Sequence, residues 1–339
     1  MTTALAHGCR RGYRGGVGNT GDRRRMPRDR DKPLDVLSVA DICVDLVLTG
    51  DVVPRFGQAE QLVDDYHLEL GGSATIFAGQ LVKLGARAGI LGSVGTDLFG
   101  DFVAGRLAEL GVAMERVVRS DNVRTGLGVA LVKESEDRTM LTYAGTIDAT
   151  APEDLTHDLP SLARHWHISS FFLLSLLRPT WASWLRRCRE AGLTTSLDTN
   201  WDPAETWDGV HEILPLIDVF LPNATEACAI AGESDVELAG RTLAGSGCVV
   251  VVKQGADGAT VFHENDMSSL DLSEEAPPPR IVDSIGAGDC FDAGFLRGWM
   301  LGWGIEACLR LGHRCGRASL SEAGGFRGQL AEDVSRDTP

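Results

Sequence analysis

Short apolar runs alternate along this chain with longer segments whose apolar residues recur at helical spacing. The runs predict strands at residues 35–40, 88–94, 194–197, 217–221 and 249–252. The helical spacing predicts helices at 72–84, 99–110, 287–301 and 304–321. Ser73 is expected to cap the first helix, and Gly85 to end it. This alternation predicts an α/β fold with a mostly parallel sheet covered by helices on both faces.

Two stretches do not follow this alternation. Residues 63–70 alternate apolar and polar side chains, and residues 127–133 with 139–143 form an expected hairpin. Strands of period two outside the βαβ series predict a small antiparallel sheet laid over the main one. Its strands are expected from about 45–70 and 125–145. Such a lid would exclude water from a phosphoryl-transfer site beneath it.

Composition narrows the choice of partner. The chain has 339 residues, 43% hydrophobic and 24% charged, which is typical of a globular protein with a sizeable core. No run of eighteen apolar residues exists, so no membrane span is expected. The formal charge of -16 disfavours nucleic acid and anionic lipid as partners and favours a small solute.

The cysteines are scattered and form no CxxC pair. They are Cys9, Cys43, Cys188, Cys228, Cys248, Cys290, Cys308 and Cys315. Most lie in apolar runs, which predicts buried free thiols and a reducing, cytoplasmic location. A zinc site is not expected, because the close His and Cys pairs lack a second pair nearby in sequence.

The first 33 residues differ from the rest, since they are rich in arginine and glycine and poor in aliphatic residues. Such a segment cannot bury enough surface to order itself. We interpret residues 1–33 as a disordered basic extension, or as an over-long start with Met26 as the initiator. A folded domain is expected over residues 34–330, followed by a C-terminal tail at 331–339.

The most informative segment is Asp-Ser-Ile-Gly-Ala-Gly-Asp at 283–289, which leads into a predicted helix. Gly286, Ala287 and Gly288 carry almost no side chain, so their amides can form an anion site at the positive end of the helix dipole. Asp289 then stands beside that anion, where a carboxylate can take a proton from an attacking hydroxyl. This combination is typical of a phosphotransferase. The alternative is a glycine-rich turn in which Asp289 only complements the dipole.

Other polar residues follow predicted strands. They are Asp41, Asp45, Gly71, Gly72, Asp97, Asp198, Asn200, Asn223 and Glu226. The carboxyl ends of parallel strands meet at one edge of the sheet, where ligands bind. Each of these residues alone is also compatible with ordinary turn chemistry.

Asn223 and Glu226 have the spacing of a helix capping box. The functional alternative is that they orient waters of a Mg²⁺ ion bound to nucleotide phosphates. Residues 253–258 (Lys-Gln-Gly-Ala-Asp-Gly) predict a strand–turn–strand whose glycines allow a nucleotide to approach, or a plain hairpin.

These motifs, in this order, resemble the ribokinase / PfkB carbohydrate kinase family from Leu34 to about Gly328. Residues 71–74 and 92–100 resemble its N-terminal signature, and Asn223-x-x-Glu226 resembles its magnesium-associated motif. Residues 283–289 resemble its C-terminal signature, in which Thr usually stands at the position of Ser284. The resemblance implies a ribokinase-like three-layer sandwich with a mostly parallel central sheet and a small antiparallel β lid.

The resemblance also implies roles for individual residues. Asp289 would be the base, with Gly286, Ala287 and Gly288 as the anion hole. The implied substrate-binding residues are Asp41, Asp45, Gly71, Gly72, Ser73, Asp97, Arg138 and Asn200. The implied nucleotide-binding residues are Asn223, Glu226, Lys253, Gly255, Gly258 and His313.

The family implies ATP, Mg²⁺ and K⁺ as cofactors. Glu226 would hold Mg²⁺ through water, and Asp283 would help to hold the monovalent cation. The substrates would be a sugar and a nucleotide, and the lid would pair two copies of the chain as a homodimer.

Two positions depart from the family pattern. Ile76 stands where members carry an Asn that binds a sugar hydroxyl, and Asp202 stands where many carry an Arg. The loss of that cation, with the acidic body, makes a sugar phosphate or sugar acid a poor substrate. We therefore expect a neutral sugar or polyol.

Several side chains keep two interpretations. Arg138 and Arg178 are expected near the cleft or on the surface, and His167 near the substrate or in the core. The aromatic residues Phe171, Phe172 and Trp201 could stack on a ligand or fill the core.

The motifs and the family resemblance are compatible with three functions. The first is an ATP-dependent, Mg²⁺-requiring sugar kinase, a phosphotransferase with an alcohol group as acceptor. A nucleoside kinase of the same fold is the second. The third is a non-catalytic sugar-binding regulator, which the intact Gly286–Asp289 segment disfavours.

Overall fold

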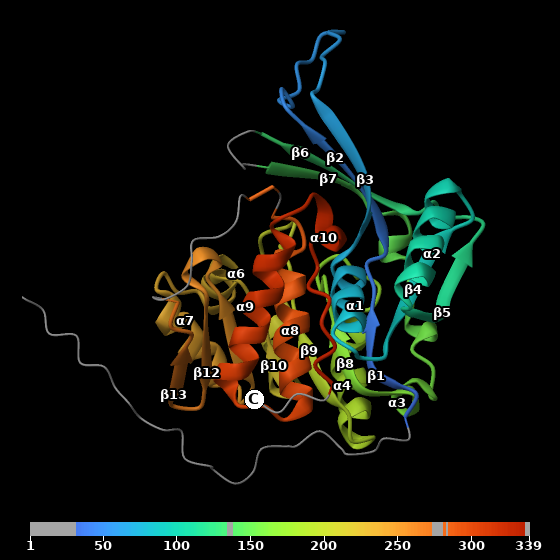
Figure 1. The fold of residues 1–339 in the computed structure, drawn as a ribbon. Coiled ribbons are helices and arrows are strands. Elements are labelled where there is room, and N and C mark those ends of the chain that lie inside the picture. Colours follow the sequence, from blue (N-terminus) through green and yellow to red (C-terminus); the bar gives the residue numbers. More distant parts are fainter. Residues whose placement is uncertain (1–31, 134–137, 273–280, 283, 336–339) are drawn as a thin grey trace, which may run out of the picture.

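The computed structural model describes residues 32–133, 138–272, 281–282 and 284–335. Its main sheet has nine strands in the order β13-β12-β11-β10-β9-β8-β1-β4-β5 (Figure 1). They are β1 (Leu34–Val39), β4 (Ala88–Gly95), β5 (Ala113–Ser120), β8 (Ala163–Ile168), β9 (Thr194–Leu197), β10 (Val219–Phe220), β11 (Val249–Lys253), β12 (Ala259–His263) and β13 (Asp266–Ser269). All strands from β11 to β5 pair in parallel, whereas β12 and β13 pair antiparallel. The predicted α/β class is confirmed.

Helices cover both faces of this sheet, as the three-layer expectation requires. One layer holds α1 (Ser73–Lys83), α2 (Leu98–Leu110), α8 (Ala287–Leu301), α9 (Ile305–Ser319) and α10 (Gly324–Arg327). The other holds α3 (Leu159–Leu162), α4 (Trp181–Glu190), α5 (Val210–Ile213), α6 (Ala224–Ala231) and α7 (Val236–Ala244). Short 3-10 turns are η1 (Gly145–Asp148), η2 (Pro152–Asp154), η3 (Arg178–Thr180), η4 (Leu214–Leu216) and η5 (Gly255–Asp257).

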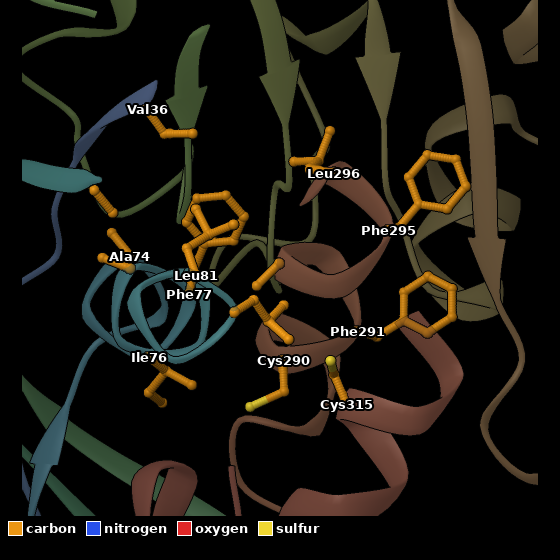
Figure 2. Close-up of a cluster of buried hydrophobic side chains, with 14 of the residues drawn as sticks. Val36, Ala74, Ile76, Phe77, Leu81, Cys290, Phe291, Phe295, Leu296 and Cys315 are labelled. Carbon is orange, nitrogen blue, oxygen red and sulfur yellow. The ribbon is translucent and has the colours of Figure 1, made fainter. Parts of the chain in front are cut away.

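The parallel strands are apolar on both faces because each face is buried against helices. Val36 of β1 and Val251 of β11 pack in the layer of α1 and α8. Their neighbours Leu37 and Val250 pack in the layer of α4 and α7. Figure 2 shows the first layer, where Phe77 of α1 lies beside α8. Each such side chain stabilises the fold by about 1.5–3 kcal/mol when fully buried.

A second sheet stands above the carboxyl edge of the first (Figure 1). Its order is β3-β2-β6-β7, with β2 (Cys43–Thr49), β3 (Asp65–Gly71), β6 (Gly126–Val132) and β7 (Arg138–Tyr143). The predicted lid is confirmed, including the antiparallel β6–β7 hairpin. The β2–β3 pair is also antiparallel, but the central β2–β6 ladder is parallel.

The start of α1 corrects one expectation. Gly72, not Ser73, occupies the N-cap position, with φ +91°, and no side chain of the cap residue accepts a hydrogen bond. A Cβ at Gly72 would lie 2.1 Å from the carbonyl oxygen of Asp41, so only glycine fits. The Asp41 carboxylate instead accepts from the backbone N–H groups of Ser73 and Ala74, each at 3.0 Å. The acceptor comes from 32 residues upstream, which helix-start rules based on near neighbours do not anticipate.

Composition predicted buried free thiols and no membrane span. Seven cysteines lie among the described residues, all as free thiols, and six of them are buried. Within the same residues no helix has both the length and the apolar character needed to cross a bilayer.

Glycines allow α9 to lie close against α8, whose first turn carries Asp289. A Cβ at Gly294 would lie 2.7 Å from the carbonyl oxygen of Leu311 and 2.8 Å from the Cα of Gly312. Both atoms belong to the backbone, so neither can move aside cheaply. The close approach of the two helices therefore depends on the missing side chain.

We predict that Gly294→Ala destabilises the protein by about 1–3 kcal/mol, because the added methyl overpacks the helix interface. The matched control is Gly105→Ala on α2, where an added Cβ has nothing within 4 Å. That change should be neutral or stabilise by up to about 1 kcal/mol through helix propensity. Denaturant unfolding measures both, and equal effects of the two substitutions would contradict the close-packing account.

Candidate active site

Polar residues from three strand ends meet at the start of α1. Ser170 follows β8, and its hydroxyl donates to Asp41 at 2.6 Å. Asn200 follows β9, and its side-chain amide donates to the hydroxyls of Ser73 at 2.6 Å and Ser170 at 2.7 Å. Asn200 adopts the left-handed conformation, with φ +53°, which Asn tolerates better than most residues. The expected convergence of strand-end residues is present at this edge of the sheet.

Asp289 joins this network from the first turn of α8. The hydroxyl of Ser73 hydrogen-bonds its carboxyl group, so the N-termini of α1 and α8 meet at this point. Gly286 is the N-cap of α8, with φ +74°. A Cβ there would lie 2.9 Å from the Cα of Gly325 and 3.0 Å from the side chain of Ile76. A glycine is therefore needed for the helix to begin here.

The surroundings of Asp289 change its acidity. Burial raises the pKa of Asp289 to about 7, and the negative charge of Asp198 acts in the same direction. Lys253 lowers it, Asp41 raises it, and the hydrogen bond from Ser73 lowers it. A carboxyl group with a pKa near neutrality can both take up and release a proton under physiological conditions, as a general base must. The amides of the first helical turn beside it are the predicted anion hole.

Lys253 lies inside this site. Its Nζ is 2.7 Å from Asp198 Oδ2 and 2.9 Å from Asp292 Oδ2, and all three side chains are largely buried. The two carboxylates keep the pKa of Lys253 above its ordinary value, although burial lowers it. Burial raises the pKa of Asp292. At Asp198 burial acts in the same direction, but the charge of Lys253 and the hydrogen bonds to the carboxylate together lower the pKa. Lys253 was predicted to border the nucleotide, and its ammonium group lies beside Gly288 of the predicted anion hole.

Asp292 was missed at the sequence level. It stands three residues after Asp289, so both lie on the same side of α8 one turn apart. Its neighbours Cys290, Phe291 and Ala293 are all buried. A single acid within a buried apolar helix was the signal available, because such a group needs a partner.

Asn223 and Glu226 form the predicted capping box at the start of α6. Asn223 Oδ1 accepts from the N–H of Glu226, and Glu226 Oε2 accepts from the N–H of Asn223, each at 2.9 Å. Burial raises the pKa of Glu226 to about 7, with Asp198 adding to the rise and Lys253 opposing it. Within the described part of the chain, no three His, Cys, Asp or Glu side chains are grouped as direct metal ligands. The assignment of Asn223 and Glu226 to a water-mediated Mg²⁺ site stays a prediction.

The lid carries three of the candidate substrate residues, namely Asp45, Arg138 and Gly71, the last residue of β3. The carboxyl group of Asp45 on β2 lies against Gly71 and Gly128, where added Cβ atoms would stand 2.5 and 2.4 Å from it. Arg138, the first residue of β7, donates from Nη1 to the hydroxyl of Ser284 at 2.9 Å. The lid thus touches the segment that leads into α8.

The remaining predicted residues lie in different surroundings. Asp97 is the N-cap of α2, and its carboxylate oxygens accept hydrogen bonds from Gly100 and Thr125. These bonds fix the start of α2. Gly255 is in η5, and an added Cβ would have nothing within 4 Å, which leaves room for a ligand. Gly258 follows it with φ +84°. His313 is partly buried on α9, and Asp283 lies outside the described residues.

The two departures from the family pattern look different in three dimensions. Ile76 is buried and packs against Gly286 and Gly325, so it forms part of the wall behind the anion hole. Asp202 accepts hydrogen bonds from the backbone N–H groups of Ala204, Thr206 and Trp207. Its carboxylate is therefore occupied by its own turn, and the cation that many family members carry at this position is absent.

The ambiguous side chains are also placed. His167 is a buried core residue that stacks on Phe77 and hydrogen-bonds Ser196. Phe171 and Phe172 are buried in the second helical layer, so the core interpretation is confirmed for both. Arg178 is half-buried, and its guanidinium lies over Phe171 and Phe172 and donates to the carbonyl of Asp208.

Residues 34–329 match the family described as pfkB family carbohydrate kinase. The chain belongs to this family. It is similar to an ATP-dependent ribose-1-phosphate kinase of Halopiger xanaduensis, with 30% identity covering 88% of this chain and 96% of that protein. The predicted family and the activity of an ATP-dependent sugar kinase, a phosphotransferase acting on a sugar hydroxyl, are confirmed at this level.

Solved structures of pfkB-type kinases share the fold. An adenosine kinase of Sinorhizobium meliloti superposes with a TM-score of 0.78 at 22% identity, covering 90% of this chain and 98% of that chain. A candidate ribokinase II of Escherichia coli, in complex with ATP and Mg²⁺, superposes with a TM-score of 0.75 at 24% identity, covering 88% and 96%. The ribokinase-like architecture predicted from the motifs is confirmed.

We predict that the Asp289→Asn variant becomes more stable relative to wild type as the pH rises. The folded state holds the Asp289 proton up to about pH 7, but the unfolded state releases it near 3.8. The stabilisation from this group is therefore lost as pH rises between these values. Asn has no proton to lose, so its stability relative to wild type should increase by about 1–3 kcal/mol from pH 5 to pH 8. Thermal unfolding at both pH values measures this, with the exposed Asp121→Asn as control. A difference that does not change with pH would contradict the assignment.

Proposed function

We propose that this pfkB-family chain transfers the γ-phosphoryl group of Mg-ATP to a hydroxyl of a neutral sugar or polyol. Asp289 accepts the hydroxyl proton, and the amides of Gly286, Ala287 and Gly288 form the anion hole. One observation carries the proposal. The N-termini of α1 and α8 converge on a single carboxyl group, through the hydrogen bond from Ser73, and the pKa of that group is raised to about 7.

The chemistry follows from this arrangement. Asp289 removes the proton from the sugar hydroxyl while the oxygen attacks the γ-phosphorus. The amides at the start of α8 stabilise the charge on the transferred group. When bound, Mg²⁺ neutralises charge on the nucleotide phosphates, and Asn223 and Glu226 are suited to orient its waters. The lid strands exclude water, which would otherwise compete with the sugar.

The choice of a neutral substrate rests on Asp45 and Asp289 rather than on Asp202. Asp45 lies on the lid strand and Asp289 on α8, and sugar hydroxyls donate hydrogen bonds readily to such groups. Asp41 is saturated by its own hydrogen bonds, so we assign it to positioning Ser73 rather than to direct contact with the sugar. Gly71 and Gly72 allow the sugar to approach the backbone. An anionic sugar would require a cation, for which Arg138 on the lid is the candidate.

The nucleoside alternative loses two of its three candidate stacking residues. Phe171 and Phe172 pack edge to face against each other, and Phe172 packs against Trp207 in the same way. Neither ring is available to stack on a base. Trp201, which is 48% exposed, is the remaining candidate for stacking on a base, and the acceptor panel decides between sugar and nucleoside.

The finer expectations remain proposals. A K⁺ site would include Asp283. Pairing of two copies through the lid is supported by the exposed apolar side chains of Tyr66, Met140, Leu141 and Tyr143 on its strands. A cytoplasmic location is supported by the free thiols.

The test is a panel of acceptors with Mg-ATP and the purified chain. The panel holds free sugars, inositol, ribose 1-phosphate and nucleosides, each with K⁺ or Na⁺, and ADP release is followed. We expect saturable turnover with a neutral sugar or polyol, faster in K⁺, and light scattering should give twice the chain mass. Turnover only with ribose 1-phosphate would replace the neutral substrate by an anionic one. Turnover only with nucleosides would contradict the sugar assignment.

A further inference from the structure

The ammonium group of Lys253 lies in a largely buried position, which is unusual for a lysine. Its side chain is 12% exposed and lies between the end of β11 and the first turns of α8. A Cβ built on Gly288 would stand 3.5 Å from Lys253 Nζ, with no other residue as close. The positive charge therefore lies directly beside the backbone that forms the proposed anion hole.

Two buried acids hold this ammonium group in place. Asp198 Oδ2 and Asp292 Oδ2 accept from Nζ at 2.7 and 2.9 Å. The Lys253 amine is thus fixed from two sides, by the end of β9 and by α8.

Asp292 supplies an independent observation. Its side chain is 1% exposed, and its Oδ1 has no hydrogen-bond partner among the described residues. A buried carboxylate oxygen without a partner is unfavourable, and a buried ion pair generally stabilises less than apolar residues of similar size. Fold stability alone therefore does not account for an acid at this position in an otherwise apolar helix.

We propose that Lys253 is a catalytic residue that contacts the transferred phosphoryl group beside Gly288, and that Asp198 and Asp292 are positioning residues that hold its ammonium group there. The proposal rests on the kinase function above and deepens it. The ammonium group adds a point charge to the partial charges of the helix amides. Because it is already desolvated and fixed, it stabilises charge on the phosphoryl group without reorganising during the reaction.

The competing explanation is that Lys253 only neutralises the buried acids. Lys253→Met alone does not separate the two, because it leaves two buried carboxylates without their cation and can unfold the protein. The double variant Lys253→Met/Asp198→Asn removes the ammonium group together with the acid whose pKa it helps to hold low, so one charge of each sign is lost. If neutralisation were the whole role, this variant would regain both stability and activity.

We expect the double variant to unfold within a few degrees of wild type but to lose about 100-fold or more in kcat, as for removal of one transition-state donor. Asp292→Asn alone should lower kcat about tenfold with little change in the KM for ATP, since the ammonium group stays but loses one anchor. The matched control is Lys32→Met, a partly buried lysine that donates to the carbonyls of Pro160 and Ala163 at the opposite edge of the sheet. That control should keep wild-type kcat.

Calorimetry supplies a readout that needs no acceptor. We compare the ratio of the affinities for ATP and ADP. In the double variant this ratio should fall about tenfold below the wild-type ratio, because only ATP carries the γ-phosphoryl group. A stable double variant with wild-type kcat and an unchanged ATP-to-ADP ratio would overturn the proposal. If wild type turned over no acceptor but the ratio changed as expected, the kinase function would fail while the contact with the terminal phosphate would stand.

Discussion

The structure depends on one electrostatic constraint at the carboxyl edge of the main sheet. Four acids, Asp198, Glu226, Asp289 and Asp292, are gathered there around the single ammonium group of Lys253. One positive charge cannot compensate four negative ones in a desolvated site, so some of the acids keep their protons. This is why burial and mutual repulsion raise the pKa values of Asp289 and Glu226 to about 7.

The fold supplies the geometry that this constraint requires. Asp41 caps α1 from the end of β1, which aligns the start of α1 with the start of α8. Gly72 and Gly286 allow these two starts to approach neighbouring backbone that any side chain would displace. The network from Asn200 through Ser73 then connects the strand ends to Asp289. Rigid elements on three sides therefore fix the carboxyl group before any ligand binds.

Local features were predictable from the sequence, and long-range ones were not. The bounds of β9 and α8 match their predictions, because buried strands and amphipathic helices depend on neighbouring residues. The capping box of α6 was predicted for the same reason. Asp41 as the cap of α1 and Asp292 as a partner of Lys253 depend on contacts between distant segments. The turn that Asp202 caps could not be predicted, because a motif gives a residue's position along the chain but not the direction of its side chain.

The most direct test of the central claim is transfer by wild type and Asp289→Asn with the acceptor that the panel identifies. Phosphorus NMR follows the γ-phosphate into the sugar phosphate, and calorimetry follows nucleotide binding. We expect Asp289→Asn to bind ATP as wild type does and to lose at least about 100-fold in kcat, because a positioned base contributes about 10²–10⁴-fold. An Asp289→Asn variant that forms the sugar phosphate at the wild-type rate would contradict the account.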